Sequence, residues 1–129
     1  MKITNTAFSV ALLLYIEAGG ESELGIKYVA SVIHNRAQSR NLSVREVISQ
    51  HAQFSGWTKK LRRRKYEEAQ NEGGDKWELC KRIAGDMAAG RFLPVTNANH
   101  YYNPRLASPS WGRKMAGVKI VGRHKFGRL

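Results

Sequence analysis

The chain has 129 residues, a length that suits one compact domain with a single hydrophobic core over residues 1–129. It carries 22 lysine and arginine residues against 10 acidic ones, a formal net charge of +12, which favours a polyanionic partner such as a nucleic acid, an anionic membrane or a cell-wall polymer. The single cysteine, Cys80, excludes an internal disulfide and a cysteine-based zinc cluster, and we expect it to be a buried apolar side chain.

The first predicted element is a helix over residues 5–18, which is apolar on nearly all sides and is therefore expected to be buried. Gly19 marks its C-terminal end. The apolar run imitates a secretory signal, but only one lysine precedes it, and cleavage near Ala18 would remove Glu17. A buried first helix is the favoured interpretation, and the run is too short to span a bilayer.

Two further helices are expected before residue 50. Apolar residues at helical spacing predict the first of them over residues 24–38. Ser43 and Glu46 have the spacing of a capping box, which predicts a short helix that ends at residue 48 or 49. The composition of residues 51–57 predicts irregular structure.

The middle of the chain is highly charged between residues 59 and 74 and is expected to break at Gly73 and Gly74. Asp75, together with Glu78, is predicted to cap a helix that ends at Gly90. The last third is rich in proline, asparagine and aromatic residues, and residues 119–126 predict a short strand or hairpin. The expected fold is therefore mostly α, with a small β element.

Glu17 stands at the end of the most apolar segment of the chain, where a charged side chain needs a partner or a function. The negative end of the helix dipole and the apolar neighbours both favour the protonated form of a carboxyl group there. A carboxyl group that holds its proton is what lysozyme uses as a general acid against a glycosidic bond. The alternative is that Glu17 caps the helix or pairs with an arginine.

Five pieces of sequence occur in an order that resembles a known family. They are YIEAGGESELGIKYVASVIHNRAQS (15–39), QFSGW (53–57), NHYYNP (99–104), Trp111 and IVGRHKFGR (120–128). Together they resemble the cell-wall hydrolases that include the bacterial spore-cortex-lytic enzymes. The resemblance implies a mostly helical fold like that of lysozyme or a lytic transglycosylase, and cleavage of peptidoglycan between N-acetylmuramic acid and N-acetylglucosamine.

The same resemblance assigns roles to two glutamates. The family's catalytic glutamate falls on Glu17, and the second glutamate of the motif falls on Glu21, as a catalytic helper or a structural partner. The chain departs from the family pattern at Gly19, at Gly127 and in the basic insert at 59–65. The glycines affect the expected substrate contacts and not the assignment of Glu17.

The carboxylates also bear on the reaction. A hydrolase needs two opposed carboxylates, whereas a lytic transglycosylase needs one, which protonates the leaving oxygen and then deprotonates the 6-hydroxyl of the muramic acid. Glu21 and Glu23 are expected in a turn beside Glu17. One well-placed glutamate favours the transglycosylase, and a muramidase that hydrolyses the same bond is the alternative.

The predicted sugar groove combines polar and aromatic side chains. The hydrogen-bonding candidates are Gln53, Ser55 and Asn103, with turn formation as their alternative role. The stacking candidates are Tyr101, Tyr102 and Trp111, with core packing as theirs. His124 is expected to orient a loop or a carboxylate, or to be purely structural.

Two interpretations compete with an enzyme of the cell wall. The basic run at 59–65 and the four histidines suggest a nuclease or nucleic-acid-binding protein, but the histidines lack metal-ligand spacing and no acidic residue follows Asp86. The second competing interpretation is a wall-binding module without activity, which would be revealed by a Glu17 substitution that has no effect. We expect no nucleic acid, metal or organic cofactor.

A compact, basic, wall-degrading domain without a convincing export signal resembles a bacteriophage endolysin. Such a protein is made in the host cytoplasm and reaches the wall through a membrane lesion. We expect a monomer whose positive charge contacts anionic envelope polymers, weakly at high salt. A bacterial enzyme is the alternative source.

Overall fold

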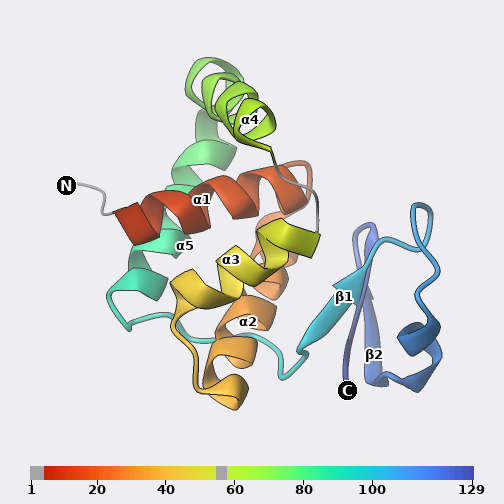
Figure 1. Ribbon diagram of the computed structural model, residues 1–129. Coiled ribbons are helices and arrows are strands. Elements are labelled where there is room, and N and C mark those ends of the chain that lie inside the picture. Colours follow the sequence, from red (N-terminus) through yellow and green to blue (C-terminus); the bar gives the residue numbers. More distant parts are fainter. Residues whose placement is uncertain (1–4, 55–57) are drawn as a thin grey trace.

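The computed structural model describes residues 5–54 and 58–129, without the side chains of residues 5 and 52–54. In this part of the chain five α-helices precede a small antiparallel sheet, which confirms the expected mostly α fold with a small β element (Figure 1). The helices are α1 (Asn5–Ala18), α2 (Glu23–Arg40), α3 (Val44–Phe54), α4 (Lys59–Glu72) and α5 (Gly74–Ala88).

Helix α1 runs through the middle of the helical bundle, with α5 packed against it (Figure 1). Val10, Ala11, Leu13 and Leu14 are completely buried, because the helix is apolar on nearly all sides. The predicted buried first helix is therefore confirmed. Among the described residues no helix is long and apolar enough to cross a membrane.

The start of α3 confirms the predicted capping box. The Ser43 hydroxyl accepts the Glu46 N–H, and the Glu46 carboxylate accepts the Ser43 N–H. The predicted end of this helix is wrong, because α3 continues to Phe54. Val47, Ile48 and His51 fall on one face of the longer helix. The helix continues past its predicted end because it packs against α1 and α2. Residues 55–57 of the segment predicted as irregular lie outside the described residues.

The predicted break at Gly73 and Gly74 separates α4 from α5, and Gly74 has a positive φ of 50°. The predicted cap at Asp75 is wrong. Gly73 is the N-cap residue, and Asp75 lies in the first turn, where its charge complements the helix dipole. Helix α5 ends at Ala88, close to the predicted position. Cys80 is completely buried, and burial raises the pKa of its thiol to about 12.

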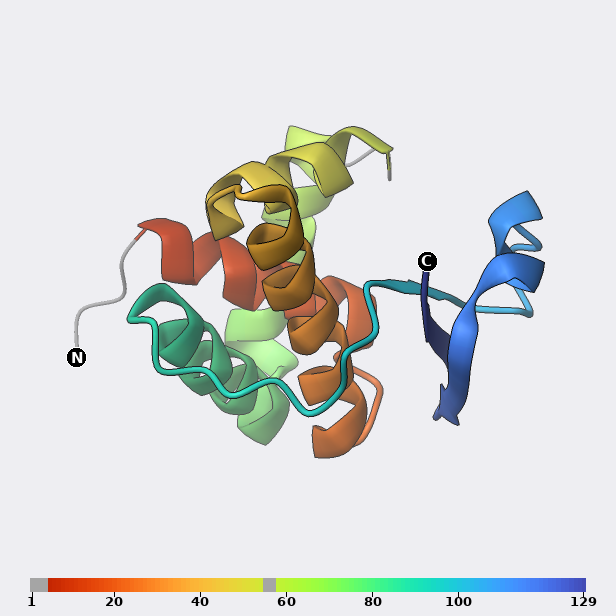
Figure 2. The same cartoon turned by 90° about the horizontal axis from the view of Figure 1, so that it is seen from below.

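The segment between α5 and the sheet runs along α2 (Figure 2). Polar side chains of that helix hold it there. The Ser31 hydroxyl accepts the N–H of Val95 at 2.9 Å. The Asn35 amide donates to the carbonyl groups of residues 96 and 98, both at 2.8 Å. These bonds satisfy the backbone of an irregular segment and carry the chain to the first strand.

The sheet has the strand order β1-β3-β2 and lies beside the helical bundle (Figures 1 and 2). Its strands are β1 (His100–Tyr102), β2 (Ala116–Val121) and β3 (His124–Arg128), and a short 3₁₀ helix, η1 (Ser110–Lys114), precedes β2. The predicted hairpin is confirmed as β2 and β3. In β3 Phe126 is 1% exposed, lies opposite Tyr101 of β1 and packs edge-on against Tyr28 of α2, which anchors the sheet to the bundle.

Candidate active site

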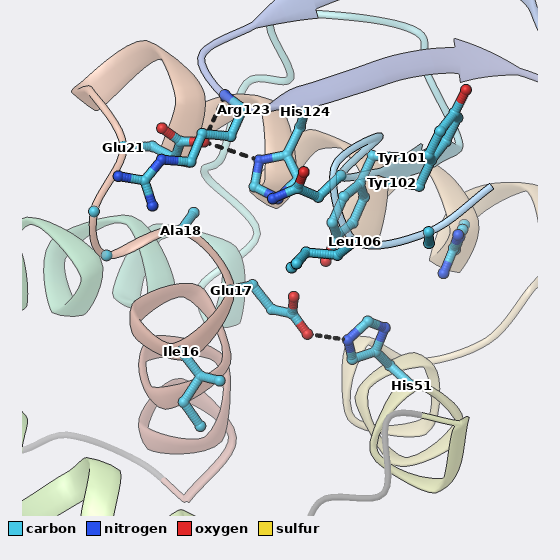
Figure 3. A pocket seen from close by; sticks show the side chains of 15 residues that line it. Ile16, Glu17, Ala18, Glu21, His51, Tyr101, Tyr102, Leu106, Arg123 and His124 are labelled. Atoms are coloured by element: carbon cyan, nitrogen blue, oxygen red, sulfur yellow. Dashed lines mark hydrogen bonds and ion pairs between the residues drawn. The ribbon is translucent and has the colours of Figure 1, made fainter. Parts of the chain in front are cut away.

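A cavity of about 480 Å³ opens between the helical bundle and the sheet (Figure 3). Its helical wall consists of residues 16–21 at the end of α1, Arg36 of α2 and His51 of α3. Its other wall is contributed by Tyr101, Tyr102, Asn103, Leu106, Ala107, Arg123 and His124. Both predicted glutamates therefore border one cavity, together with three of the four predicted sugar-binding residues whose side chains the structure describes.

Glu17 points into this cavity from the last turn of α1 and contacts His51 (Figure 3). The Oε1 atom of Glu17 lies 2.5 Å from the Nε2 atom of His51. The two side chains are 21% and 20% exposed, so the pair is four-fifths buried and still reachable from the cavity. The alternative prediction that Glu17 pairs with an arginine is not what the structure shows. Its partner is a histidine.

Tyr101 places a buried phenol beside this pair. Its ring stacks on the His51 imidazole, with 6.5 Å between the ring centroids. Burial, and then the negative charge of Glu17, raise the pKa of Tyr101 well above its ordinary value. The hydroxyl group is buried and has no partner in good hydrogen-bond geometry within the described part of the chain. Tyr101 therefore stays a neutral donor close to the Glu17 carboxyl group.

Glu21 is engaged by the β2–β3 turn. It is 8% exposed, and its Oε1 atom accepts the N–H of Arg123 at 2.9 Å and lies 3.1 Å from Nδ1 of His124. The Lys76 ammonium group also donates to the backbone carbonyl of Glu21. His124 thus orients a carboxylate, one of the roles expected from the sequence. The contacts of Glu21 are those of a structural partner, the second of the two roles predicted for it.

Arg36 brings a positive charge to the cavity wall. Its Nε atom donates to the carbonyl oxygen of Asn99 at 2.6 Å, which fixes the guanidinium group at the start of β1. Burial, partly offset by the nearby Tyr101, lowers the pKa of Arg36 from its ordinary value. A fixed guanidinium group beside a polar cavity can donate hydrogen bonds to hydroxyl or carboxylate oxygens of a ligand.

The remaining predicted site residues differ in position. Tyr102 and Asn103 line the cavity, and Asn103 also forms the predicted turn, because its Oδ1 atom accepts the N–H of Arg105. Trp111 is not among the lining residues and packs edge-on against Tyr102 and His100. Gln53 lies in the last turn of α3, where its side chain is not described, and Ser55 lies outside the described residues.

Sequence reasoning missed His51 and Arg36 as site residues. A signal for His51 was available, because it follows Val47 and Ile48 at the i+4 and i+3 spacing of one helix face. The helix was expected to end before it. Arg36 gave no such signal, because its position in the site depends on a hydrogen bond to Asn99, which lies 63 residues later in the sequence.

In the described residues no group of three or more histidine, cysteine, aspartate or glutamate side chains is placed to hold a metal ion. The cavity presents a carboxyl group that a ligand can reach, an adjacent imidazole and a buried phenol. Such an arrangement suits proton transfer to and from a bound hydroxyl or ether oxygen.

The sequence profile of the cell wall hydrolase family matches residues 20–127, a range that begins three positions after Glu17. Among solved structures, the catalytic domain of the germination-specific lytic transglycosylase SleB from Bacillus anthracis is similar, with a TM-score of 0.65 and 26% sequence identity. The similarity covers 98% of this chain and 97% of that domain. No curated protein sequence matches the chain.

Proposed function

The chain belongs to the cell wall hydrolase family and is an enzyme that acts on peptidoglycan, and we propose that it is a lytic transglycosylase with Glu17 as its acid and base. The bond cleaved in this proposal joins N-acetylmuramic acid to N-acetylglucosamine. The resemblance of the five sequence segments to this family is thereby confirmed at the level of the family.

In the proposed reaction Glu17 first protonates the glycosidic oxygen as the bond to the anomeric carbon breaks. The Glu17 carboxylate then takes the proton from the 6-hydroxyl group of the same muramic acid, whose oxygen closes a 1,6-anhydro ring. No water is consumed, and Glu17 ends the cycle protonated, as it began. One carboxyl group is sufficient for both proton transfers.

The observation that carries this proposal is the different engagement of the two glutamates on the cavity wall. Glu17 is reachable from the cavity, whereas the Glu21 carboxylate is held by Arg123 and His124. A hydrolase of the usual two-carboxylate kind needs a second carboxylate that can act on a nucleophilic water or on the sugar. The arrangement of the described residues therefore favours the one-carboxylate reaction over the muramidase alternative.

The sugar chain is proposed to bind along the sheet side of the cavity. Tyr101, Tyr102 and Asn103 line that side. Tyrosine rings stack on the apolar faces of sugars, and the asparagine amide can bond to N-acetyl groups. Gln53 and Ser55 remain predicted contacts, and Trp111 is expected to act only through the position of Tyr102.

Mass spectrometry of digested peptidoglycan tests the proposal. The wild-type enzyme is expected to release fragments that end in 1,6-anhydro-muramic acid, and Glu17→Gln is expected to release none while remaining folded. Glu23→Gln is the matched control, because it makes the same chemical change on an exposed glutamate six residues away. It should leave the products and the rate unchanged.

Two outcomes would contradict the proposal. Fragments that are heavier by one water and end in a reducing muramic acid would identify a muramidase. Cleavage by Glu17→Gln at the wild-type rate would remove Glu17 from the mechanism altogether.

We further propose that the biological role is lysis of a host cell, with the protein made in the host cytoplasm, as in a bacteriophage endolysin. The support is its high positive charge, which suits contact with anionic envelope polymers. Expression in the bacterial cytoplasm is expected to lyse cells only when the inner membrane is permeabilised, and the Glu17→Gln variant should not lyse them. Lysis without permeabilisation would contradict this role.

A further inference from the structure

The contact between Glu17 and His51 suggests a role for a residue outside the five family-like segments, and this inference rests on the proposed function of Glu17. We propose that His51 is a positioning residue. It shares a proton with Glu17 and so retains the proton that Glu17 delivers to the glycosidic oxygen.

The geometry allows a direct proton transfer within the pair. Glu17 reaches the cavity from α1 and His51 reaches it from α3, and the two side chains meet across the cavity wall (Figure 3). The distance of 2.5 Å between Oε1 and Nε2 leaves no room for an intervening water. A proton on the pair can therefore belong to either residue.

Other groups that face the pair limit how many protons it holds. Arg36 of α2 lines the same cavity, Tyr101 lies on β1 and stacks on the imidazole, and Glu21 is already paired with His124. The positive charge of Arg36 opposes a second proton, which would give the pair a net charge of +1. The neutral Tyr101 phenol does not add charge. The form with a single proton is therefore favoured over the form with two.

The single proton can lie on His51, which gives an ion pair, or on Glu17, which gives a neutral pair. In the open cavity water favours the ion pair of imidazolium and carboxylate, because both charges keep part of their hydration. A sugar chain that fills the cavity covers the remaining fifth of both side chains. Desolvation then disfavours the two charges and favours neutral imidazole and carboxylic acid. Substrate binding itself would move the proton from Nε2 to Oε1.

The proton balance closes over one turnover. Rotation about the last bond of the Glu17 side chain, a broad two-fold torsion, aims the acid proton at the glycosidic oxygen. That oxygen takes the proton and the bonding electron pair as the bond to the anomeric carbon breaks. The 6-hydroxyl oxygen then bonds to that carbon, and its proton passes to Glu17. His51 is neutral throughout these steps and shares the proton again when the product leaves.

A comparison of pH–rate profiles tests the inference. An isolated glutamate loses its proton about two pH units below an isolated imidazole. Without His51 the proton should therefore be lost at lower pH, so the alkaline limb of kcat/KM for His51→Gln should move down by about one to two pH units. The ratio of the variant's kcat/KM to that of the wild type should therefore fall as the pH rises.

The control is His34→Gln, because His34 lies on α2 against Phe92 and does not line the cavity. Its profile should match that of the wild type. A pH profile of His51→Gln that keeps the wild-type shape would overturn the inference, whatever the size of the rate. A purely structural loss lowers the rate equally at every pH. Glu17→Gln is measured beside it. Activity in that variant would instead overturn the proposed function.

A second variant covers the case in which glutamine does not fit. His51→Ala leaves space next to Glu17, and added imidazole is expected to restore both the rate and the wild-type alkaline limb. Restoration by imidazole at neutral pH would support the proton-holding role. Failure of imidazole to restore activity in a folded His51→Ala protein would contradict it.

Discussion

The Glu21 carboxylate lies 3.1 Å from Nδ1 of His124, and this contact fastens the turn after α1 to the β2–β3 hairpin. The same oxygen accepts the N–H of Arg123, 102 residues away in sequence. Both side chains of the pair are at most 10% exposed. The hairpin contributes Arg123 and His124 to the cavity wall, so Glu21 determines where that wall stands relative to Glu17.

Removal of Glu21 is expected to destabilise the fold. Glu21→Ala leaves the Arg123 N–H and the His124 ring without their buried partner, and the free energy of unfolding should fall by about 3 kcal/mol. Glu21→Gln keeps one acceptor for the N–H and should cost less. Urea unfolding measures both values. If Glu21 were instead a second catalytic carboxylate, Glu21→Gln would abolish turnover without a loss of stability.

A substitution at Gly122, in the β2–β3 turn, tests the Glu21 contact from the hairpin. The φ of Gly122 is +59°, and a Cβ atom there would lie 2.6 Å from Oε2 of Glu21. Gly117 is a matched control, because its φ is +62° and a Cβ atom there meets nothing within 4 Å. Both alanine variants should lose about 1 kcal/mol to the left-handed backbone. Gly122→Ala should lose about 2 kcal/mol more, from the displaced Glu21 contacts. Equal losses would show that the Glu21 contact adds nothing.

Local chemistry made several elements predictable from the sequence. Ser43 and Glu46 cap the same helix start in the structure as in the sequence pattern, because a capping box depends only on residues three positions apart. The apolar run before Glu17 predicted a buried helix for the same local reason. Asp75 misled the prediction, since a carboxylate near a helix start can lie at the cap or inside the first turn.

The partners within the site were not predictable in this way. Glu17 and His51 are 34 residues apart, and Glu21 meets the β2–β3 turn 102 residues later. Both contacts depend on the packing of whole elements, which spacing along the chain does not encode. The family-like motifs marked the Glu17 and Glu21 segments as important, but the structure was needed to show that both border one cavity and that Glu21 is held by the β2–β3 hairpin.

His100 is expected to make the fold less stable in acid. Burial, and then the positive charges of Arg36 and Arg40, lower the pKa of His100 to about 4. In the unfolded chain its imidazole takes up a proton near pH 6.5. Between these values the unfolded state binds more protons, so the free energy of unfolding falls as the pH drops from about 6.5 to about 4.

The measurement is urea unfolding of the wild type and of His100→Gln at several pH values. The loss of ring packing against Trp111 lowers stability by the same amount at every pH. The difference between the two proteins should therefore shrink as the pH falls through this window. A difference that stays constant from pH 7 to pH 4 would mean that the folded protein binds a proton on His100 as readily as the unfolded chain does.

Helix α4 presents a basic face to solvent. Lys60, Arg63 and Arg64 are exposed at i, i+3 and i+4, and none of the three forms an ion pair within the described residues. Replacing all three by glutamine preserves helix propensity and removes three positive charges. If this face contacts anionic envelope polymers, the triple variant should bind cell walls more weakly, and its binding should depend less on salt.

A second triple variant separates this face from net charge alone. Arg113, Lys114 and Lys119 are also exposed basic residues but lie on η1 and β2, and their replacement by glutamine removes the same charge. Co-sedimentation with purified walls at low and high salt compares the two proteins. Stronger loss of binding in the α4 variant, with unchanged cleavage of short soluble glycan fragments, would identify α4 as the contact surface. Equal losses would show that only the total charge matters, since long-range attraction depends on the summed field of the molecule.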